Sequence, residues 1–287
     1  MRGGGEEMKT EQEIIAGSHP IAPHIYGVWL QSTDLPASAG KKHRTLVEDY
    51  GQRNAAIEKL SQWIVDYHVH KHSKRNIDEQ KKLLDKHQLG DYIDKLKLLP
   101  TADRTKKGNL GEIILIEYLK ASRGFLPYVH RLQYNTNTNQ SMKGDDVLMF
   151  NPTALFSEIL FGECKFRKTP TKKVVEDIVS NLEGAKRLPI SMGFVANVLE
   201  DRGEQALADA ITELQLKVEN GLVPVSNVGF LISTKSDTVV SKDTKQQVEK
   251  YLKTSNTRLV MISLGVENPI QIVDEAFAKA EEILKTL

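Results

Sequence analysis

The chain has 287 residues, enough for one large domain or two ordinary ones, and its 40% hydrophobic and 27% charged residues are typical of a globular protein. No apolar run is long enough to cross a bilayer, and the net charge of +1 means that any nucleic-acid binding must come from a local patch or a partner. The single cysteine, Cys164, excludes an internal disulfide framework and favours a cytoplasmic location.

The first hundred residues are predicted to be mostly helical. Residues 1–18 contain Gly and acidic residues where a signal peptide would have an apolar core, so we expect a flexible leader. "HIYGVWLQ" (24–31) is typical of a strand, and apolar residues at helical spacing predict a helix over 45–69. A second, more polar helix is predicted over 78–100, where Pro100 ends it. Residues 19–104 would thus form a helical accessory region with Trp29 and Trp63 in its core.

The pattern changes at about residue 105. A helix is predicted over 106–124, with Gly124 as its terminator. The segments after it predict an α/β core over residues 105–287, in which a central mixed sheet is flanked by helices. The predicted strands are 126–134, 145–150, 158–167, 191–198, 228–234 and 258–264, and the predicted helices are 171–187, 200–221, 244–253 and 270–287.

Charged residues lie inside one of these apolar strands. In "FGECKFR", alternation places Glu163 and Lys165 on one face, and Cys164 and Phe166 on the other. A buried Glu is costly unless it is paired or binds a metal. Because Asp146 begins the neighbouring strand, we expect two carboxylates and one ammonium to converge at an edge of the sheet.

These residue types suit metal-assisted hydrolysis of a phosphodiester. Asp146 and Glu163 would hold Mg²⁺, or Mn²⁺ in its place, and the backbone carbonyl of Cys164 would complete the protein ligands. The ammonium of Lys165 would orient the attacking water and stabilise the charge that develops on the phosphate. The alternative is a structural Glu–Lys pair on an edge strand, with an Asp that forms a turn.

The motif "GDD…GECK" resembles the D…ExK signature of the PD-(D/E)XK nuclease superfamily, with Asp146, Glu163 and Lys165 at the signature positions. "LGEIILIEYL", "KGDDVLMF" and "LFGECKFRKTP" together resemble the HamA family, the nuclease subunit of the bacterial Hachiman antiphage system. The resemblance is good over residues 105–190. It implies a PD-(D/E)XK fold and a metal-supporting role for Glu112. The signature also implies that Asp146 is the metal ligand and Asp145 the variable position.

The resemblance also implies partners. Members of the HamA family act on DNA together with a superfamily 2 helicase, HamB, which restrains the nuclease and licenses DNA degradation during infection. The near-neutral net charge of this chain is compatible with a helicase that supplies most of the DNA affinity. A bacterial cytoplasmic location follows from the same resemblance.

Other charged residues allow two interpretations. The basic residues Arg167, Lys168, Lys172 and Lys173 could contact DNA phosphates near the metal or form a solvated face. Glu112 could equally be a first-turn acid that favours a helix N-terminus. The histidines of "HVHKH" (68–72) lack the further ligands of a tetrahedral zinc site, so we expect a solvated helix end. Cys164 has no paired base and is expected in the core.

Two rival functions follow from the same fold. One is a restriction-type or repair-type nuclease, which a neighbouring methyltransferase gene would support. The other is a catalytically silent scaffolding subunit, which could lose any of Asp146, Glu163 and Lys165 without harm to the fold. A neighbouring helicase gene would favour the HamA interpretation over both.

Overall fold

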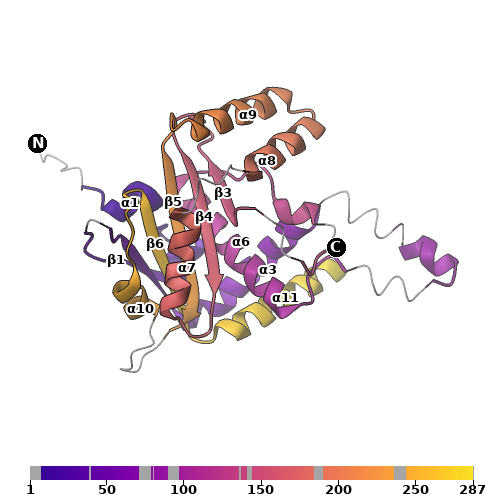
Figure 1. Ribbon diagram of the computed structural model, residues 1–287. Coiled ribbons are helices and arrows are strands. Elements are labelled where there is room, and N and C mark those ends of the chain that lie inside the picture. Colours follow the sequence, from indigo (N-terminus) through magenta and orange to yellow (C-terminus); the bar gives the residue numbers. More distant parts are fainter. Residues whose placement is uncertain are drawn as a thin grey trace, which may run out of the picture.

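The computed structural model describes residues 8–38, 40–70, 79, 81–89, 97–135, 137–140, 144–183, 190–235 and 244–286. These residues contain one six-stranded sheet in the order β1-β2-β6-β5-β4-β3 (Figure 1). The strands are β1 (Leu30–Asp34), β2 (His43–Glu48), β3 (Val147–Phe150), β4 (Ile159–Phe166), β5 (Val225–Thr234) and β6 (Leu259–Val266). The predicted α/β class with a mixed central sheet is confirmed.

The interior of the sheet is parallel and its edges are antiparallel. β2, β6, β5 and β4 run parallel to one another, whereas β1 pairs antiparallel with β2 and β3 pairs antiparallel with β4. Every residue of β6 is buried, and so are the eight central residues of β5. Such runs are typical of parallel strands that are covered on both faces.

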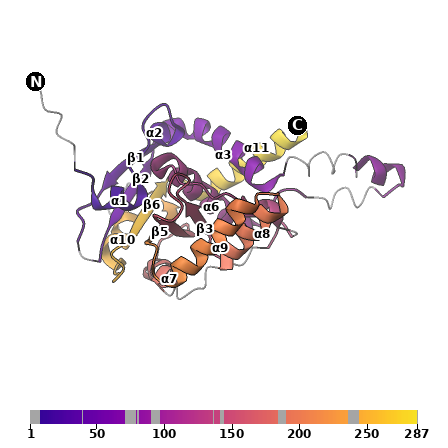
Figure 2. The ribbon, with the colours of Figure 1, turned by 90° about the horizontal axis from the view of Figure 1, so that it is seen from above.

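Helices cover both faces of the sheet (Figures 1 and 2). One face carries α6 (Asp103–Arg123), with α3 (Arg53–His68), α2 (Ile25–Trp29) and α11 (Pro269–Thr286) beyond it, and α1 (Glu11–Ala16) lies at its margin. The other face carries α7 (Lys172–Glu183), α10 (Thr244–Tyr251) and the pair α8 (Ile190–Asp201) and α9 (Gln205–Glu219). Side-chain alternation divides the core accordingly, because Phe230 belongs to the α6 face and Leu231 to the α7 face.

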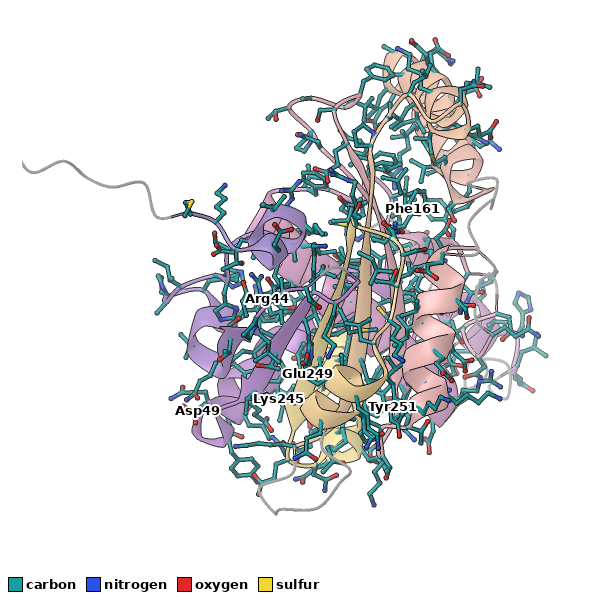
Figure 3. All side chains as sticks on the ribbon, turned by 60° about the vertical axis from the view of Figure 1, so that its left-hand side comes forward. Arg44, Asp49, Phe161, Lys245, Glu249 and Tyr251 are labelled. Atoms are coloured by element: carbon teal, nitrogen blue, oxygen red, sulfur yellow. The ribbon has the colours of Figure 1, made fainter. Side chains whose placement is uncertain are left out.

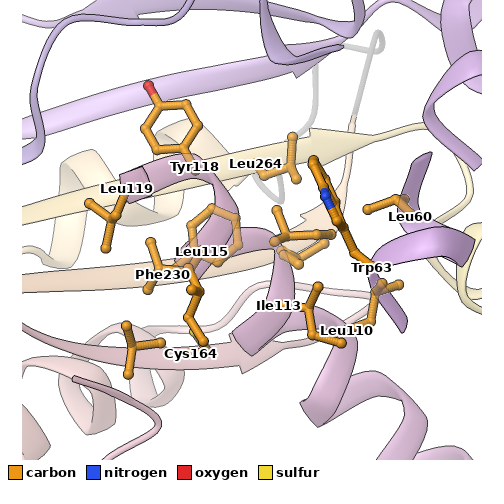
Figure 4. Close-up of a cluster of buried hydrophobic side chains, with 14 of the residues drawn as sticks. Leu60, Trp63, Leu110, Ile113, Leu115, Tyr118, Leu119, Cys164, Phe230 and Leu264 are labelled. Carbon is orange, nitrogen blue, oxygen red and sulfur yellow. The ribbon is translucent and has the colours of Figure 1, made fainter. Parts of the chain in front are cut away.

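The core between α6 and the sheet is tightly packed. Figure 4 shows Leu115 and Leu119 of α6 close to Phe230 and Cys164, with Trp63 of α3 alongside. A Cβ on Gly162 would lie 2.8 Å from Leu115 Cδ2 and 2.9 Å from Val147 Cβ, so this position in β4 has room for glycine alone without a shift of its neighbours. The predicted burial of Trp29, Trp63 and Cys164 is confirmed.

The predicted helix and strands around the motif are confirmed. α6 ends before Gly124, whose φ of 69° is left-handed, as expected for a glycine helix terminator. The strands β3, β4, β5 and β6 and the helices α7, α9, α10 and α11 fall within or close to their predicted ranges. Residues 184–187, at the end of one predicted helix, lie outside the described residues.

The secondary structure predicted for the first hundred residues is wrong in several places. Residues 25–29 form a short helix whose buried Tyr26 and Trp29 lie on one side, and β1 begins only at Leu30. Residues 43–48 form β2, which pairs with β6 more than two hundred residues later in the chain, and the helix α3 begins at Arg53. Pairing over such a distance cannot be seen in a local apolar pattern.

The accessory region and the core therefore share one sheet. The boundaries 1–18, 19–104 and 105–287 remain a prediction. In the sequence, β1 and β2 precede residue 104 and β3–β6 follow it, yet all six strands form one sheet. Residues 11–16 of the expected leader form α1, whose Ile15 is buried, and residues 1–7 lie outside the described residues. Most of the predicted helix 78–100 also lies outside them.

Two further strand predictions are wrong. Residues 190–201 form the helix α8, because Met192, Val195, Ala196 and Leu199 are spaced to bury one helical face in a core shared with α9 and β3. Residues 126–134 contribute only an isolated bridge between Leu126 and Phe150 and the 3-10 helix η2 (Arg131–Tyr134).

A buried polar network joins α10 to the N-terminal strands. His43 of β2 shares hydrogen bonds with Ser263 of β6, at 2.7 Å from Nε2, and with Glu249 of α10, at 2.8 Å from Nδ1. Figure 3 shows Glu249 and Lys245 on α10. Burial lowers the pKa of His43 to about 4, so at neutral pH this network is held by hydrogen bonds of a neutral imidazole.

His68 is buried, so the expected solvated helix end is wrong. Its Nδ1 lies 2.8 Å from the Ile64 carbonyl and its Nε2 lies 2.8 Å from Asn109 Nδ2, and burial lowers its pKa to about 4. His72 lies outside the described residues. None of the helices in the described part of the chain is long and apolar enough to span a membrane.

Candidate functional site

The predicted acidic residues of the D…ExK motif face one another across two strands. β3 and β4 pair Val147 with Gly162, and the same register extended by one residue sets Asp146 opposite Glu163. Opposite residues of an antiparallel pair share one face, with Cβ atoms about 5 Å apart. This is the face that α7 and α8 cover, whereas Cys164 belongs to the core on the α6 face. The predicted alternation in "FGECKFR" is confirmed.

Glu163 is 5% exposed, and β4 lies between β3 and β5, so the edge-strand position in the structural alternative is wrong, although the Glu163–Lys165 pair itself is present. Two cationic or polar side chains contact it. Lys165 Nζ forms an ion pair with Glu163 Oε1, and Asn181 Nδ2 of α7 donates to the same oxygen at 2.6 Å. Because both contacts use Oε1, Glu163 Oε2 has no hydrogen-bond partner among the described residues.

Asp146 is held by its neighbours in a similar way. Its Oδ2 accepts a hydrogen bond from the backbone N–H of Cys164 at 2.9 Å. Its Oδ1 lies 3.9 Å from Arg131 Nη2, too far for a hydrogen bond, and is otherwise unengaged by the described residues. Each of the two opposed carboxylates therefore keeps one oxygen for a further ligand.

Glu112 reaches the cluster from α6 through Arg131. Arg131 Nη2 donates to Glu112 Oε2 at 2.9 Å, and Nη1 of the same guanidinium donates to the Asp145 carbonyl. Asp145 N in turn donates to Ser191 Oγ of α8 at 2.9 Å. Arg131 thus joins α6, η2 and the start of β3 at the open edge of the sheet.

The electrostatics of the cluster are those of carboxylates that are crowded and poorly solvated. Burial raises the pKa of Glu112 to about 7, an effect that the Arg131 charge opposes and the Asp146 and Glu163 charges reinforce. Burial and the Glu163 charge also raise the pKa of Asp146 above its usual range, against the hydrogen bond from Cys164. Shifted carboxylates of this kind gather at functional sites, because a bound cation offsets their repulsion.

Lys165 is cationic at neutral pH. Burial alone would lower its pKa, but the hydrogen bond and charge of Glu163 and the charge of Asp146 raise it above the usual value for lysine. A lysine of this kind suits electrostatic stabilisation of an anion, because it holds its proton too firmly to act as a base at neutral pH.

Two polar side chains at the cluster were missed by the sequence analysis. Arg131 lies in a segment that was predicted to be a strand, where its direction could not be inferred, and it contacts Glu112 and lies near Asp146. Asn181 is two and a half turns into α7, on the side that faces β4. Only the packed structure shows that Arg131 lies beside two acids and that the amide of Asn181 contacts Glu163.

The donor set fits one Mg²⁺ better than a larger metal centre. In the described part of the chain, no group of three or more His, Cys, Asp or Glu side chains is placed to hold a metal ion. Mg²⁺ commonly uses one or two carboxylates and fills its other positions with water and phosphate oxygens. The free oxygens of Asp146 and Glu163, with the carbonyl of Cys164 next to Glu163 in β4, match that requirement.

The basic residues after β4 are exposed. Arg167 donates to the Phe166 carbonyl at 2.8 Å, and Lys172 pairs with Glu176 of the same helix at 3.4 Å. Lys168 and Lys173 are also exposed. A role of these four residues in binding DNA phosphates stays a prediction.

The fold and the cluster define an α/β protein in which two carboxylates, a lysine and an arginine converge beside an edge strand. The family model HamA matches residues 24–280. A protein of Bacillus cereus described as Hachiman protein HamA is 38% identical over 275 residues, which cover 96% of this chain and 97% of that protein. The chain therefore belongs to the HamA family, and the family expected from the motifs is confirmed. The likeness extends well beyond residues 105–190, into the N-terminal strands.

Proposed function

We propose that this protein is a Mg²⁺-dependent deoxyribonuclease of PD-(D/E)XK type that acts in the bacterial cytoplasm, as the effector of an antiphage defence system, together with a superfamily 2 helicase. The observation that carries the proposal is the opposition of Asp146 and Glu163 across β3 and β4, with Lys165 paired to Glu163. Membership of the HamA family supports the defence role and the helicase partner.

The chemistry assigned to each residue follows from its contacts. Asp146 and Glu163 would hold the metal ion through Oδ1 and Oε2, with the Cys164 carbonyl as a third ligand. Bound there, Mg²⁺ would polarise the scissile phosphate and acidify a water ligand. Mn²⁺ would serve in its place.

Lys165 would stabilise negative charge that develops on the phosphate, since its ammonium keeps its proton at neutral pH. Asn181 positions Glu163 by donating to Oε1, which leaves Oε2 without a described partner, so that Oε2 could bind the metal ion. Arg131 holds Glu112 at the cluster, where Glu112 would support the metal through a water ligand.

The test is nicking and linearisation of a plasmid by the purified chain with Mg²⁺, alone and with its helicase and ATP. Glu163→Gln and Lys165→Met should each lower the rate by about 100-fold or more, as for the loss of one group that stabilises the transition state. Glu213 and Lys217 form an exposed pair on α9 at 2.8 Å, so Glu213→Gln and Lys217→Met are matched controls that should keep full activity.

Equal cleavage by the wild type and both site variants would contradict the assignment of the site. Absence of cleavage by the wild type, even with the helicase and ATP, would favour the silent scaffolding subunit instead.

A further inference from the structure

A partly open cavity of about 270 Å³ adjoins the candidate site. Its lining residues come from α6 and α8, among other segments, and from Leu148 of the edge strand β3. Figure 1 shows where these elements lie. Asp146 and Glu112 line it, so the cavity and the cluster share a wall. Most of its walls are apolar, and they include Ile113, Ile116, Val129, Leu148, Phe194 and Val195.

Two polar groups that line this cavity have hydrogen-bonding capacity that the described residues do not use. Ser191 Oγ accepts a hydrogen bond from Asp145 N and donates to no described residue. Glu112 accepts the hydrogen bond of Arg131 at Oε2, and its Oε1 accepts none from a described residue. The cavity thus offers one donor and one acceptor beside its apolar walls.

These features restrict the chemistry of a ligand. Among the described lining residues, the acids Glu112, Asp145 and Asp146 outnumber the guanidinium of Arg131, which disfavours a phosphate inside the cavity. A purely aliphatic group would leave the Ser191 hydroxyl and Glu112 Oε1 without partners. A flat heterocycle suits both the apolar walls and these polar groups, because its faces pack on apolar surface and its edge carries donors and acceptors.

A nucleobase is the heterocycle that a DNA substrate brings to this position. A base inside a duplex is stacked and paired, so it cannot enter a protein cavity unless it leaves the helix. An unpaired strand has no such barrier, and stacking of one base on protein is worth about 1–3 kcal/mol.

We propose that this cavity receives one unpaired base of the strand that is cut, next to the scissile phosphate, so that the substrate is single-stranded or locally unwound DNA. The proposal rests on the proposed function for the identity of the polymer. The helicase would then supply the substrate, because strand separation produces unpaired bases that fit the cavity.

The experiment measures binding of the full-length chain to an oligonucleotide that carries the fluorescent base 2-aminopurine, with EDTA present to prevent cleavage. The wild type should bind the single strand at least about fivefold more tightly than the same sequence as a duplex, which is the lower limit for stacking of one base. A strand of the same length built from abasic nucleotides should bind as weakly as the duplex. Equal binding of the abasic and the normal strand would overturn the proposal.

A cavity-filling variant gives an independent measurement. Val195→Phe would place a ring in the cavity, whereas Val198→Phe adds the same ring in the same helix at a residue that does not line it and is similarly buried, at 6% exposure against 5%. We expect Val195→Phe to lose the preference for single strands and Val198→Phe to keep it. The abasic strand tests the wild type even where both variants fold poorly.

Cleavage assays separate this proposal from the proposed function. If the wild type cuts duplex and single strand equally and Val195→Phe changes neither rate, the cavity proposal fails and the nuclease stands. If no DNA is cut with Mg²⁺, even with the helicase and ATP, but binding still favours the normal single strand over the abasic one, the nuclease proposal fails and the cavity proposal stands.

Discussion

Replacement of Glu112 by glutamine should change how the stability of the protein depends on pH. Glu112 is nearly buried, with 12% of its side chain exposed, and its carboxylate lies near those of Asp146 and Glu163. Its pKa is about 7 in the folded protein, against an ordinary value of 4.5. Glu112→Gln keeps the shape of the side chain and removes the charge.

The sign and size of the effect follow from these two pKa values. Below pH 4.5 the carboxyl holds its proton in both states and contributes no pH dependence. Between pH 4.5 and 7 the folded state binds more protons than the unfolded state, so the wild type loses stability as the pH rises. The full loss, reached above pH 7, is about 3 kcal/mol, at 1.36 kcal/mol for each unit that separates the pKa values.

The assay is urea denaturation of the wild type and Glu112→Gln at pH 5 and pH 8, with EDTA to keep metal away. The free energy of unfolding of the variant relative to the wild type should rise by about 2–3 kcal/mol from pH 5 to pH 8. Loss of the contact with Arg131 adds an offset at both pH values, which the comparison removes. Glu213→Gln, an exposed control on α9, should show no such change. A difference that is constant or shrinks between pH 5 and pH 8 would refute the reasoning.

Three other changes have definite expected outcomes. Gly162→Ala should lower the free energy of unfolding by about 1–3 kcal/mol, because its Cβ would crowd Leu115. The control Gly108→Ala in α6 meets nothing within 4 Å and should raise the free energy of unfolding by about 0.5–1 kcal/mol. Thermal unfolding of the two variants and the wild type measures both effects. Asn181→Leu should lower kcat for plasmid cleavage by about tenfold and keep KM, and a change in KM alone would contradict a positioning role. Mg²⁺ at about 100 times its Kd should stabilise the wild type by about 2.7 kcal/mol and leave Asp146→Asn unaffected, as measured by calorimetry; equal stabilisation of both would place the metal elsewhere.

The candidate site was predictable where its chemistry is local in the sequence. Side-chain alternation within β4 predicted Glu163 and Lys165 on one face and Cys164 on the other, and the structure confirms this arrangement. The Gly–Asp–Asp segment just before an apolar strand brought Asp146 to the same face. The helix that carries Glu112 was predicted from its apolar spacing and its terminal glycine.

The rest depended on contacts between distant segments. Arg131 came from a segment predicted to be a strand, and only the packing of η2 against α6 and β3 brought its guanidinium to Glu112. The wall that α8 contributes to the cavity could not be predicted either, because its apolar residues were interpreted as a strand.

What the sequence by itself determined was the α/β class, the motif and the family, since these depend on the order of residues over a few turns or strands. Only the tertiary structure decided that β1 and β2 complete the sheet and that a largely apolar cavity adjoins the carboxylates. The physical reason is that strand pairing and cavity walls join residues far apart in the chain, whose meeting depends on the packing of the whole fold rather than on local preference.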